Sequence, residues 1–504
     1  MLLKKIIDLI KKHYLFFIFL SLIVVLVFLT YKNYGVTWDE VYYIQIGRHY
    51  TIQILDVLKI PHNLIEYNFN PSNLHLQSHG VFFDVLVILL TPLFRSFNLE
   101  IYHLIKALLA LFSFIFLYSI LIKFLSNKWA LLGVILLLLF PHFYGDIFNN
   151  SIDIPTLTIF TLYLYLFLHF INKKDSFIRL ILLSFSLSIL INQRIVFLYA
   201  FLLTCLFLIK KPKLIFLLST FTFIFLHLTH PYLWQHPIIG FFNILKTSNS
   251  FPFTAANLFN GQFVEANQLP WYYIPKLMAI TSPLSTLGLF IIGNFYLLFS
   301  IFNKKIPSKL KMTYAYFLSL FYIPLIIVFI MRPVLYDSWR HFLFLTMPFI
   351  IIAVFGAYAI SRIKNNLIKI ILFGLIAINL LQTAFEMKTL HPYQYVYYNS
   401  LVGGLKGADR KYETDYWGAT YKEAVLWFNK NINNPNKIYY IATQGDPLSS
   451  VYYFKKNMIF TNDYNKVNYI ISFTRWNSDQ QYTGKTIYKV EREGVPLVYI
   501  KEFP

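Results

Sequence analysis

Long runs of apolar residues alternate with short polar segments along most of this chain. Eleven of these runs are long enough, or nearly so, to cross a bilayer as a helix, which takes about 20 residues. They cover residues 14–30, 101–123, 129–143, 155–171, 177–191, 195–209, 214–230, 277–302, 313–331, 342–360 and 367–385. The pattern predicts a polytopic α-helical membrane protein with about 11 transmembrane helices.

The charges between the runs predict the orientation of the chain. With a cytoplasmic N-terminus, 19 lysines and arginines fall in the N-terminal segment and in short cytoplasmic loops, as the positive-inside rule expects. A twelfth apolar stretch, 81–98, is shorter and contains Asp84 and Pro92. Counting it as a span would move every later basic loop to the opposite side, so we expect an interfacial helix on the outer face. The predicted topology is N-in and C-out.

The predicted outer segments are long, and the last of them differs in character. Loops 31–100 and 231–276 are expected outside the membrane. From residue 386 the chain becomes polar, with a helical pattern at 421–431. Short strand-like stretches follow at 437–442, 467–472, 486–490 and 496–500. We therefore expect a transmembrane domain over 1–385 and a small extracytoplasmic α/β domain over 386–504.

Composition and charge restrict the possible functions. The chain is 57% hydrophobic, and the basic loops explain its net charge of +21 better than nucleic-acid binding does. The single cysteine, Cys205, excludes a disulfide framework and a cysteine-ligated zinc site. The cytoplasmic loops are too short for a nucleotide-binding domain, and no Walker-type glycine loop is present. Group transfer would therefore take place on the outer face, where an activated donor arrives on a lipid carrier.

A few charged side chains at the outer ends of the predicted helices are the candidates for this chemistry. Ionisable groups at membrane level are costly and tend to be functional. The predicted topology brings them to one face, so we expect them to converge. They are Asp39, Glu40, Asp146, Asp153, Arg194, Asp337, Arg340 and His341.

Asp39 is the candidate general base. A carboxylate that accepts the proton of an attacking hydroxyl contributes roughly 10²–10⁴-fold to the rate, whereas the alternative is a solvated loop acid. Glu40 either tunes Asp39 or faces water. Asp153 would bind acceptor, sugar or metal, although Asp-Ile-Pro also suits a helix start with Asp as N-cap. Asp146 is a further candidate beside it.

Arg340 and Arg194 are the candidate phosphate ligands. Arginine offers a planar, permanently charged fork for phosphate oxygens and would stabilise a leaving phosphate. Contact with lipid headgroups is the alternative for both. His341 would donate to the same phosphate or serve a structural role.

The ordered set of motifs resembles the GT-C superfamily of glycosyltransferases, in particular its protein O-mannosyltransferase and aminoarabinose-transferase-like branch. Asp39-Glu40 stands where that branch carries its first-loop Asp-Glu, and Asn149-Asn-Ser-Ile-Asp-Ile-Pro155 is similar to a motif of bacterial members. Tyr336-Asp-Ser-Trp-Arg-His341 resembles their late Arg-His motif. His391 to Asn399, Gly403-Gly404 and Asp415 to Gly418 also resemble bacterial members. The resemblance covers roughly residues 1–425.

The resemblance implies an inverting sugar transfer from a polyprenyl-phosphate donor, with Asp39 as base and no required metal or other cofactor. The acceptor would be a glycolipid, a lipopolysaccharide or a protein, and no nucleic acid is expected. The implied location is a bacterial inner membrane, with the site facing the periplasm. The tail lacks the β-trefoil repeat of eukaryotic O-mannosyltransferases, so it gives no support for a protein acceptor.

Two other functions remain open at this point. A transporter or flippase of lipid-linked sugars would carry charges in mid-span and show pseudo-symmetric halves; here the candidate charges lie at outer helix ends and the sequence shows no repeat. A metal-dependent relative of the oligosaccharyltransferase kind would use Asp39, Asp146 and Asp153 as ligands.

Overall fold

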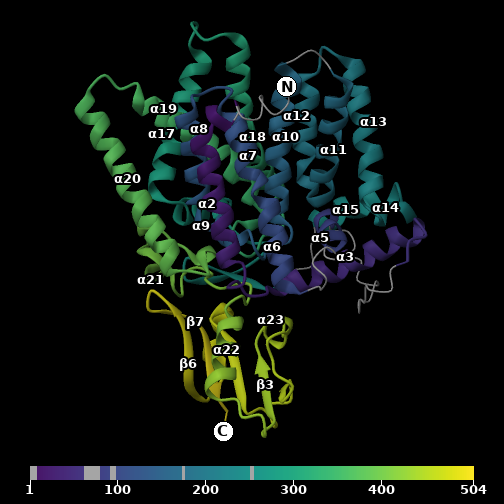
Figure 1. Ribbon diagram of the computed structural model, residues 1–504, viewed down its shortest axis with the longest axis vertical. Helices are drawn as coiled ribbons and strands as arrows, with labels where there is room; N and C mark the ends of the chain where they lie inside the picture. The colour runs from purple at the N-terminus through teal and green to yellow at the C-terminus, as the bar shows by residue number, and fades with distance from the viewer. Residues whose placement is uncertain are drawn as a thin grey trace.

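The computed structural model describes residues 8, 10–61, 80–90, 98–172, 176–249 and 255–503. Its larger part is a bundle of helices, and a small sheet domain is attached at one end of the long axis (Figure 1). The bundle helices are α2 (Tyr14–Thr30), α6 (Leu99–Ala110), α7 (Phe112–Leu121), α8 (Asn127–Leu138), α10 (Asp153–Asn172), α11 (Phe177–Gln193), α12 (Leu198–Phe207), α13 (Pro212–Thr229), α17 (Leu284–Phe302), α18 (Ser308–Met331), α19 (Thr346–Ser361) and α20 (Asn366–Thr389).

Each of the predicted apolar runs contains a described helix. Seven helical stretches are long and apolar enough to cross a membrane: Leu99–Leu121, Asp153–Ile171, Pro212–Thr229, Leu284–Phe302, Ser308–Met331, Arg340–Ser361 and Asn366–Thr389. Four shorter apolar helices lie at the remaining predicted spans: Tyr14–Thr30, Asn127–Leu138, Phe177–Gln193 and Ile195–Phe207. A multi-pass membrane protein is thereby confirmed. The total of eleven crossings and their orientation stay predictions.

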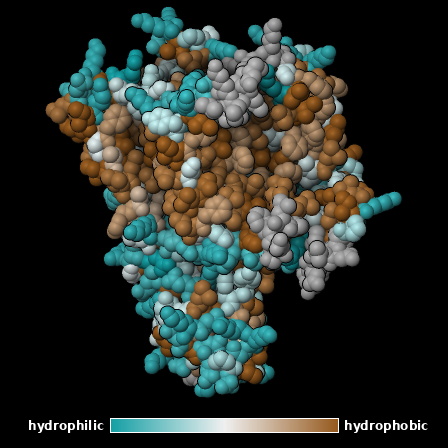
Figure 2. Space-filling view, viewed as in Figure 1, coloured by the Kyte–Doolittle hydropathy of each residue, from teal (hydrophilic) through white to brown (hydrophobic). Residues whose placement is uncertain are grey.

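The bundle is apolar on its outside as well as in its core. On the face that Figure 2 shows, a hydrophobic belt covers the helices between more hydrophilic ends. Phe302 at the end of α17 and Leu381 on α20 are 80% and 73% exposed, as expected for side chains that face lipid. The inner helix α19 is almost entirely buried. Gly356 on α19 lets α17 approach closely, because a Cβ there would lie 2.0 Å from the Leu289 carbonyl oxygen.

Two helices, α3 (Trp38–Val57) and α5 (Phe82–Leu90), lie at the end of the bundle that faces the sheet domain (Figure 1). Helix α5 occupies the start of the predicted interfacial stretch 81–98, of which residues 91–97 lie outside the described residues. The predicted loop 231–276 contains several short elements. They are α14 (Tyr232–Gln235), α15 (Ile239–Asn249), β1 (Ala256–Phe259), β2 (Gln262–Glu265) and α16 (Tyr273–Thr281).

The C-terminal domain is a five-stranded mixed sheet in the order β4-β3-β5-β7-β6. Its strands are β3 (Tyr439–Thr443), β4 (Met458–Phe460), β5 (Tyr469–Phe473), β6 (Lys485–Arg492) and β7 (Val495–Glu502). β3 pairs in parallel with β4 and β5, whereas β7 is antiparallel to β5 and β6. α22 (Tyr421–Asn431) packs on β6 and β7 and coincides with the predicted helix 421–431.

The segment between α20 and α22 joins the two parts of the molecule. Tyr395 and Trp417 in this segment are each 1% exposed. The Asn399 amide donates hydrogen bonds of 2.8 and 2.7 Å to the carbonyls of Ala279 and Ser282, next to the start of α17. The segment between α20 and α22, residues 390–420, therefore forms a buried layer between the C-terminal domain and the helix bundle.

Candidate active site

Asp39 lies in the first turn of α3, and its backbone is fixed from two sides. Thr37 is the N-cap of the helix, and its hydroxyl accepts a hydrogen bond of 3.3 Å from the Glu40 N–H. The same hydroxyl donates to the Asn149 carbonyl at 3.3 Å, just before α10. The Trp38 N–H donates to the Trp417 carbonyl at 3.3 Å, in the layer that leads to the C-terminal domain. Asp39 is thus placed where three parts of the chain meet.

Arg340 is the centre of a cluster of carboxylates. Its Nη2 atom lies 2.9 Å from Asp39 Oδ2 and 3.0 Å from Asp337 Oδ2. Its Nη1 atom lies 3.5 Å from Asp153 Oδ2. The Arg340 side chain is only 7% exposed. The structure therefore brings Asp39, Asp153 and Arg340 together, at the start of α3, the start of α10 and the end of the loop before α19.

Asp153 forms a second ion pair, with Arg194 at the end of α11. The Arg194 Nε–H donates to Asp153 Oδ1 at 3.0 Å, and an Nη2–H donates to the same oxygen. Sequence allowed Asp153 as an N-cap, but it is the first residue of α10, and its own N–H donates to Asn150 Oδ1 at 2.7 Å. The Asp153 side chain is thereby free to face the two arginines.

Asp146 lies next to Asn150 and Asp153, and within the described residues it forms no ion pair with an arginine. The Asn150 amide bridges the two acids, donating to Asp146 Oδ2 at 3.2 Å and to Asp153 Oδ2 at 3.1 Å. Asp146 is fully buried, and burial raises its pKa well above the ordinary value. Asp146 thus supports Asp153 through the Asn150 amide.

Arg475, from the C-terminal domain, completes the cluster and was not among the residues predicted from sequence. Its Nη2–H donates to Asp337 Oδ1, and Nη1–H donates to the Tyr416 carbonyl at 2.7 Å. The guanidinium carbon lies 5.2 Å from the Trp38 ring and 4.3 Å from the Trp476 ring, which confines it between two aromatic faces. Asp337 therefore links Arg475 to Arg340.

Among the clustered carboxylates, Asp39 is the one open to a substrate. Its side chain is 26% exposed, against 1% for Asp153 and 3% for Asp337. Burial raises the pKa of Asp39, the charge of Arg340 opposes that effect, and Asp337 and Asp153 add to the rise. The result is an accessible carboxylate with a pKa above its ordinary value, which suits a group that must accept a proton.

Glu40 points away from this cluster into a separate buried ion pair. It has no exposed surface, and its carboxylate lies 2.9 Å from His103 Nε2 and 3.2 Å from Lys106 Nζ. Lys106 also donates to the Ser151 hydroxyl at 3.0 Å. Burial alone would raise the pKa of Glu40, but the charges of His103 and Lys106 outweigh it and lower the pKa. Glu40 therefore anchors α3 to α6 rather than facing the site of Asp39.

His341, predicted beside Arg340, is half-buried and packs edge-on against Tyr336, with ring centroids 4.6 Å apart. Arg340 lies over the same tyrosine ring, 5.3 Å from its centroid. Within the described residues, no group of three or more His, Cys, Asp and Glu side chains is arranged to hold a metal ion. The absence of a required metal remains a prediction.

Comparisons with known proteins identify relatives of this fold. A family model described as dolichyl-phosphate-mannose-protein mannosyltransferase matches residues 78–234. A search of curated proteins finds no match. The crystal structure of ArnT from Cupriavidus metallidurans bound to undecaprenyl phosphate superposes with a TM-score of 0.51 and 11% identity, over 97% of this chain and 98% of that chain.

Two further solved structures are similar. ArnT from the same organism in the apo state gives a TM-score of 0.49 and 12% identity, over 97% of each chain. The oligosaccharyltransferase AglB from Archaeoglobus fulgidus, in complex with an inhibitory peptide and a dolichol-phosphate, gives 0.49 and 11% identity, over 92% of this chain and 70% of that chain. The family match over residues 78–234 and the fold shared with ArnT over the whole chain both support the resemblance to the GT-C superfamily of glycosyltransferases that the motifs predicted.

Proposed function

We propose that this protein transfers a sugar from a polyprenyl-phosphate donor to an acceptor hydroxyl at the outer face of the membrane, with Asp39 as general base. The acceptor oxygen attacks C1 of the sugar while its proton passes to the Asp39 carboxylate. The bond between C1 and the phosphate oxygen breaks on the opposite side, so the configuration at C1 inverts. The products are the glycosylated acceptor and the polyprenyl phosphate.

The observation that carries this proposal is the position of Asp39 in the cluster. Its side chain keeps 26% exposure and holds one Arg340 contact at 2.9 Å, while Asp153 and Asp337 are buried in ion pairs. A base has to reach the acceptor and keep a fixed direction, and Asp39 meets both conditions.

Arg340 and Arg194 have different roles in this proposal. Arg340 is enclosed by carboxylates and 7% exposed, so its main role is to orient Asp39. Arg194 is 21% exposed and contacts Asp153 with one edge of its guanidinium. Its remaining N–H groups are the better candidates to bind the donor phosphate and to stabilise it as it leaves.

A polyprenyl-phosphate donor agrees with what is known of the relatives. The matching family model is described by dolichyl-phosphate-mannose, and the superposed ArnT structure contains undecaprenyl phosphate. Helix α2 begins at the end of the bundle away from the C-terminal domain, and α3, which carries Asp39, lies at the end that faces this domain (Figure 1). We place that end outside a bacterial inner membrane, facing the periplasm.

The decisive experiment replaces Asp39 by Asn in the full chain, reconstituted with a polyprenyl-phosphate sugar and an outer-face acceptor extract. Transfer should fall by about 10²–10⁴-fold because the base is lost, while donor binding is retained. Asp56→Asn, an exposed aspartate in the last turn of α3, is the matched control and should transfer normally. Near-normal transfer by the Asp39 variant would overturn the assignment.

A further inference from the structure

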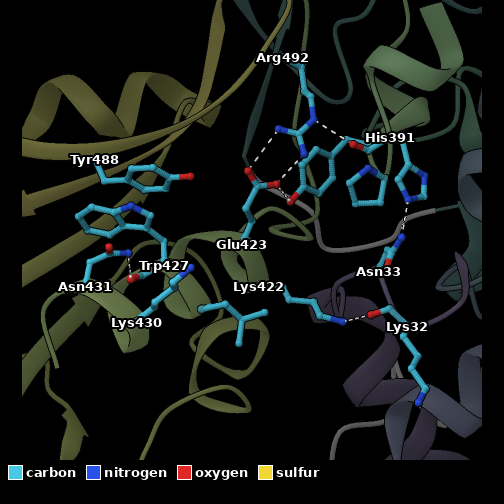
Figure 3. A pocket seen from close by; sticks show the side chains of 13 residues that line it. Lys32, Asn33, His391, Lys422, Glu423, Trp427, Lys430, Asn431, Tyr488 and Arg492 are labelled. Carbon is cyan, nitrogen blue, oxygen red and sulfur yellow. Dashed lines mark hydrogen bonds and ion pairs between the residues drawn. The ribbon is translucent and has the colours of Figure 1, made fainter. Parts of the chain in front are cut away.

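A hollow of about 770 Å³ lies between the C-terminal domain and the helix bundle, apart from the Asp39 cluster. One wall is formed by α22 and β6, and the other by Lys32 and Asn33 after α2 and by His391 to Tyr393 after α20 (Figure 3). Its volume is in the range of small-molecule sites. None of the three clustered aspartates or their arginines lines it.

The charge of this hollow is strongly positive. Its cations are Lys32, Lys422, Lys430 and Arg492, and its one carboxylate is Glu423. Glu423 is already engaged, because Arg492 Nη2 donates to it at 2.6 Å and Nη1 at 3.3 Å (Figure 3). Within the described residues, the three lysines of the lining form no ion pair with a carboxylate, and such a surface favours an anion.

An aromatic pair forms the side of the hollow next to these cations. Trp427 on α22 and Tyr488 on β6 stack in parallel, with centroids 4.2 Å apart and an interplanar angle of 6° (Figure 3). Asn431 lies beside them, and its side-chain amide donates to the Trp427 carbonyl at 2.8 Å. Flat aromatic surface with amide groups nearby suits a ring that is apolar on its faces and polar at its edges, which is the character of a sugar.

We propose that this hollow binds an anionic saccharide group, a sugar that carries a carboxylate or a phosphate. Lys32 and Lys430 are exposed and supply the charge-assisted hydrogen bonds to the anion. The Trp427–Tyr488 pair packs against the ring. Binding of the saccharide does not depend on the proposed function. Only the further role of the hollow as an acceptor-binding site rests on that function.

Lys422 connects the hollow to the loop that leads to Asp39. Its ammonium group donates to the Lys32 carbonyl and, at 3.1 Å, to the Tyr34 carbonyl, five residues before Asp39. A saccharide bound here lies against the same backbone that positions the base. This is where a second part of an acceptor glycan would be held while its hydroxyl is glycosylated.

The test measures binding directly, by calorimetry on the full chain in phosphatidylcholine nanodiscs. The probes are a hyaluronan tetrasaccharide, which carries carboxylates, glucose 6-phosphate, and the uncharged chitotetraose. The two anionic probes should bind, and chitotetraose should bind at least about tenfold more weakly, since each charge-assisted hydrogen bond is worth about that factor.

Variants separate this site from the surrounding surface and from catalysis. Lys32→Ala with Lys430→Ala should weaken the anionic probes about tenfold or more. Lys437→Ala, an exposed lysine of the same domain outside the hollow, should leave the affinity unchanged. Asp39→Asn should bind the probes normally although it does not transfer sugar. A failed test of the proposed function can therefore be distinguished from a failed test of this binding site.

Three results would overturn the inference. One is equal affinity of the anionic and uncharged probes for the wild-type chain. Another is unchanged binding in the double lysine variant. The last is loss of probe binding when phosphatidylglycerol is included in the nanodisc, since the hollow would then be a lipid-headgroup site.

Discussion

At the scale of single residues, the proposed role of Asp39 as base makes its pKa the quantity that sets how transfer depends on pH. The group works as the carboxylate, and burial raises its pKa above 3.8 despite the opposing charge of Arg340. Transfer should therefore be lost on acidification at a higher pH than for an ordinary aspartate. Arg340→Gln removes the opposing charge, so the pKa should rise further and the acid limb of the kcat/KM profile should move to higher pH. An acid limb that does not move in this variant would contradict Asp39 as the titrating base.

Glu40, the neighbour of Asp39 in sequence, should affect stability rather than turnover. Glu40→Gln leaves Lys106 and His103 buried without their counter-charge, and breaking one side of a buried ion pair costs about 3–5 kcal/mol. The pKa of Glu40 is lowered in the folded protein. Its stabilisation should thus be complete near neutral pH and be lost as the pH falls through that lowered value.

Thermal unfolding in detergent checks this expectation. Glu40→Gln should lower Tm, and the double variant with Lys106→Met should recover part of the loss because the unpaired ammonium group of Lys106 is then removed as well. Asp39→Asn, at a partly exposed position, should leave Tm nearly unchanged. A Glu40 variant with wild-type Tm and strongly reduced kcat would instead assign Glu40 to the chemistry.

At the scale of elements, helices and strands could be predicted where the local pattern of polar and apolar residues alone determines the structure. Helix α22 could be predicted to the residue because its polar and apolar positions alternate with helical spacing. Four of the five sheet strands could be predicted, whereas β4 has three residues and offers too little pattern. Helix α3 was described only as part of loop 31–100, although Thr37 followed by Glu40 three positions later is a helix-start signal.

The short connection into α3 leads to a prediction about Gly35. A Cβ at this position would lie 2.0 Å from the Ala419 carbonyl oxygen, so Gly35→Ala must displace either the loop before Asp39 or the layer beneath the C-terminal domain. Activity should fall by about 10²-fold, the cost of a misplacement of about 1 Å at a catalytic group. Gly288→Ala on α17, where a Cβ meets nothing within 4 Å, is the control and should be as active as wild type. Equal activity of both variants in the transfer assay would show that the loop adjusts without moving Asp39.

At the scale of the whole molecule, the charge cluster shows what a single sequence can and cannot reveal. Asp39, Asp153, Arg194 and Arg340 could be selected because charges are rare in an apolar chain and these lie at helix ends. Lys106 could have been selected on the same ground, since it lies inside the apolar run 101–123. Arg475 gave no comparable signal, because it lies in a polar domain and contacts a residue 138 positions away.

This contact makes the C-terminal domain part of the proposed active site. Arg475 neutralises Asp337, and Asp337 shares Arg340 with Asp39. Without Arg475, the uncompensated Asp337 carboxylate competes more strongly for Arg340 and draws it from Asp39. The positive charge of Arg475 also lowers the pKa of Asp39, so its removal should raise that pKa.

Arg475→Gln should therefore reduce kcat by about tenfold or more through misplacement of the base, and should shift the acid limb of the pH profile upward. Arg475→Lys keeps the charge and should restore the pH profile more fully than kcat, because lysine lacks the planar fork. Arg410→Gln breaks an ion pair of 2.6 Å with Asp479 in the same domain, and neither of these two residues is among the charges that shift the pKa of Asp39. If both glutamine variants lower Tm but neither moves the pH profile, the role of Arg475 is only to stabilise the attachment of the C-terminal domain to the helix bundle. A pH shift confined to Arg475→Gln would establish that a residue of the C-terminal domain sets the charge state of the proposed base, Asp39, in the helix bundle.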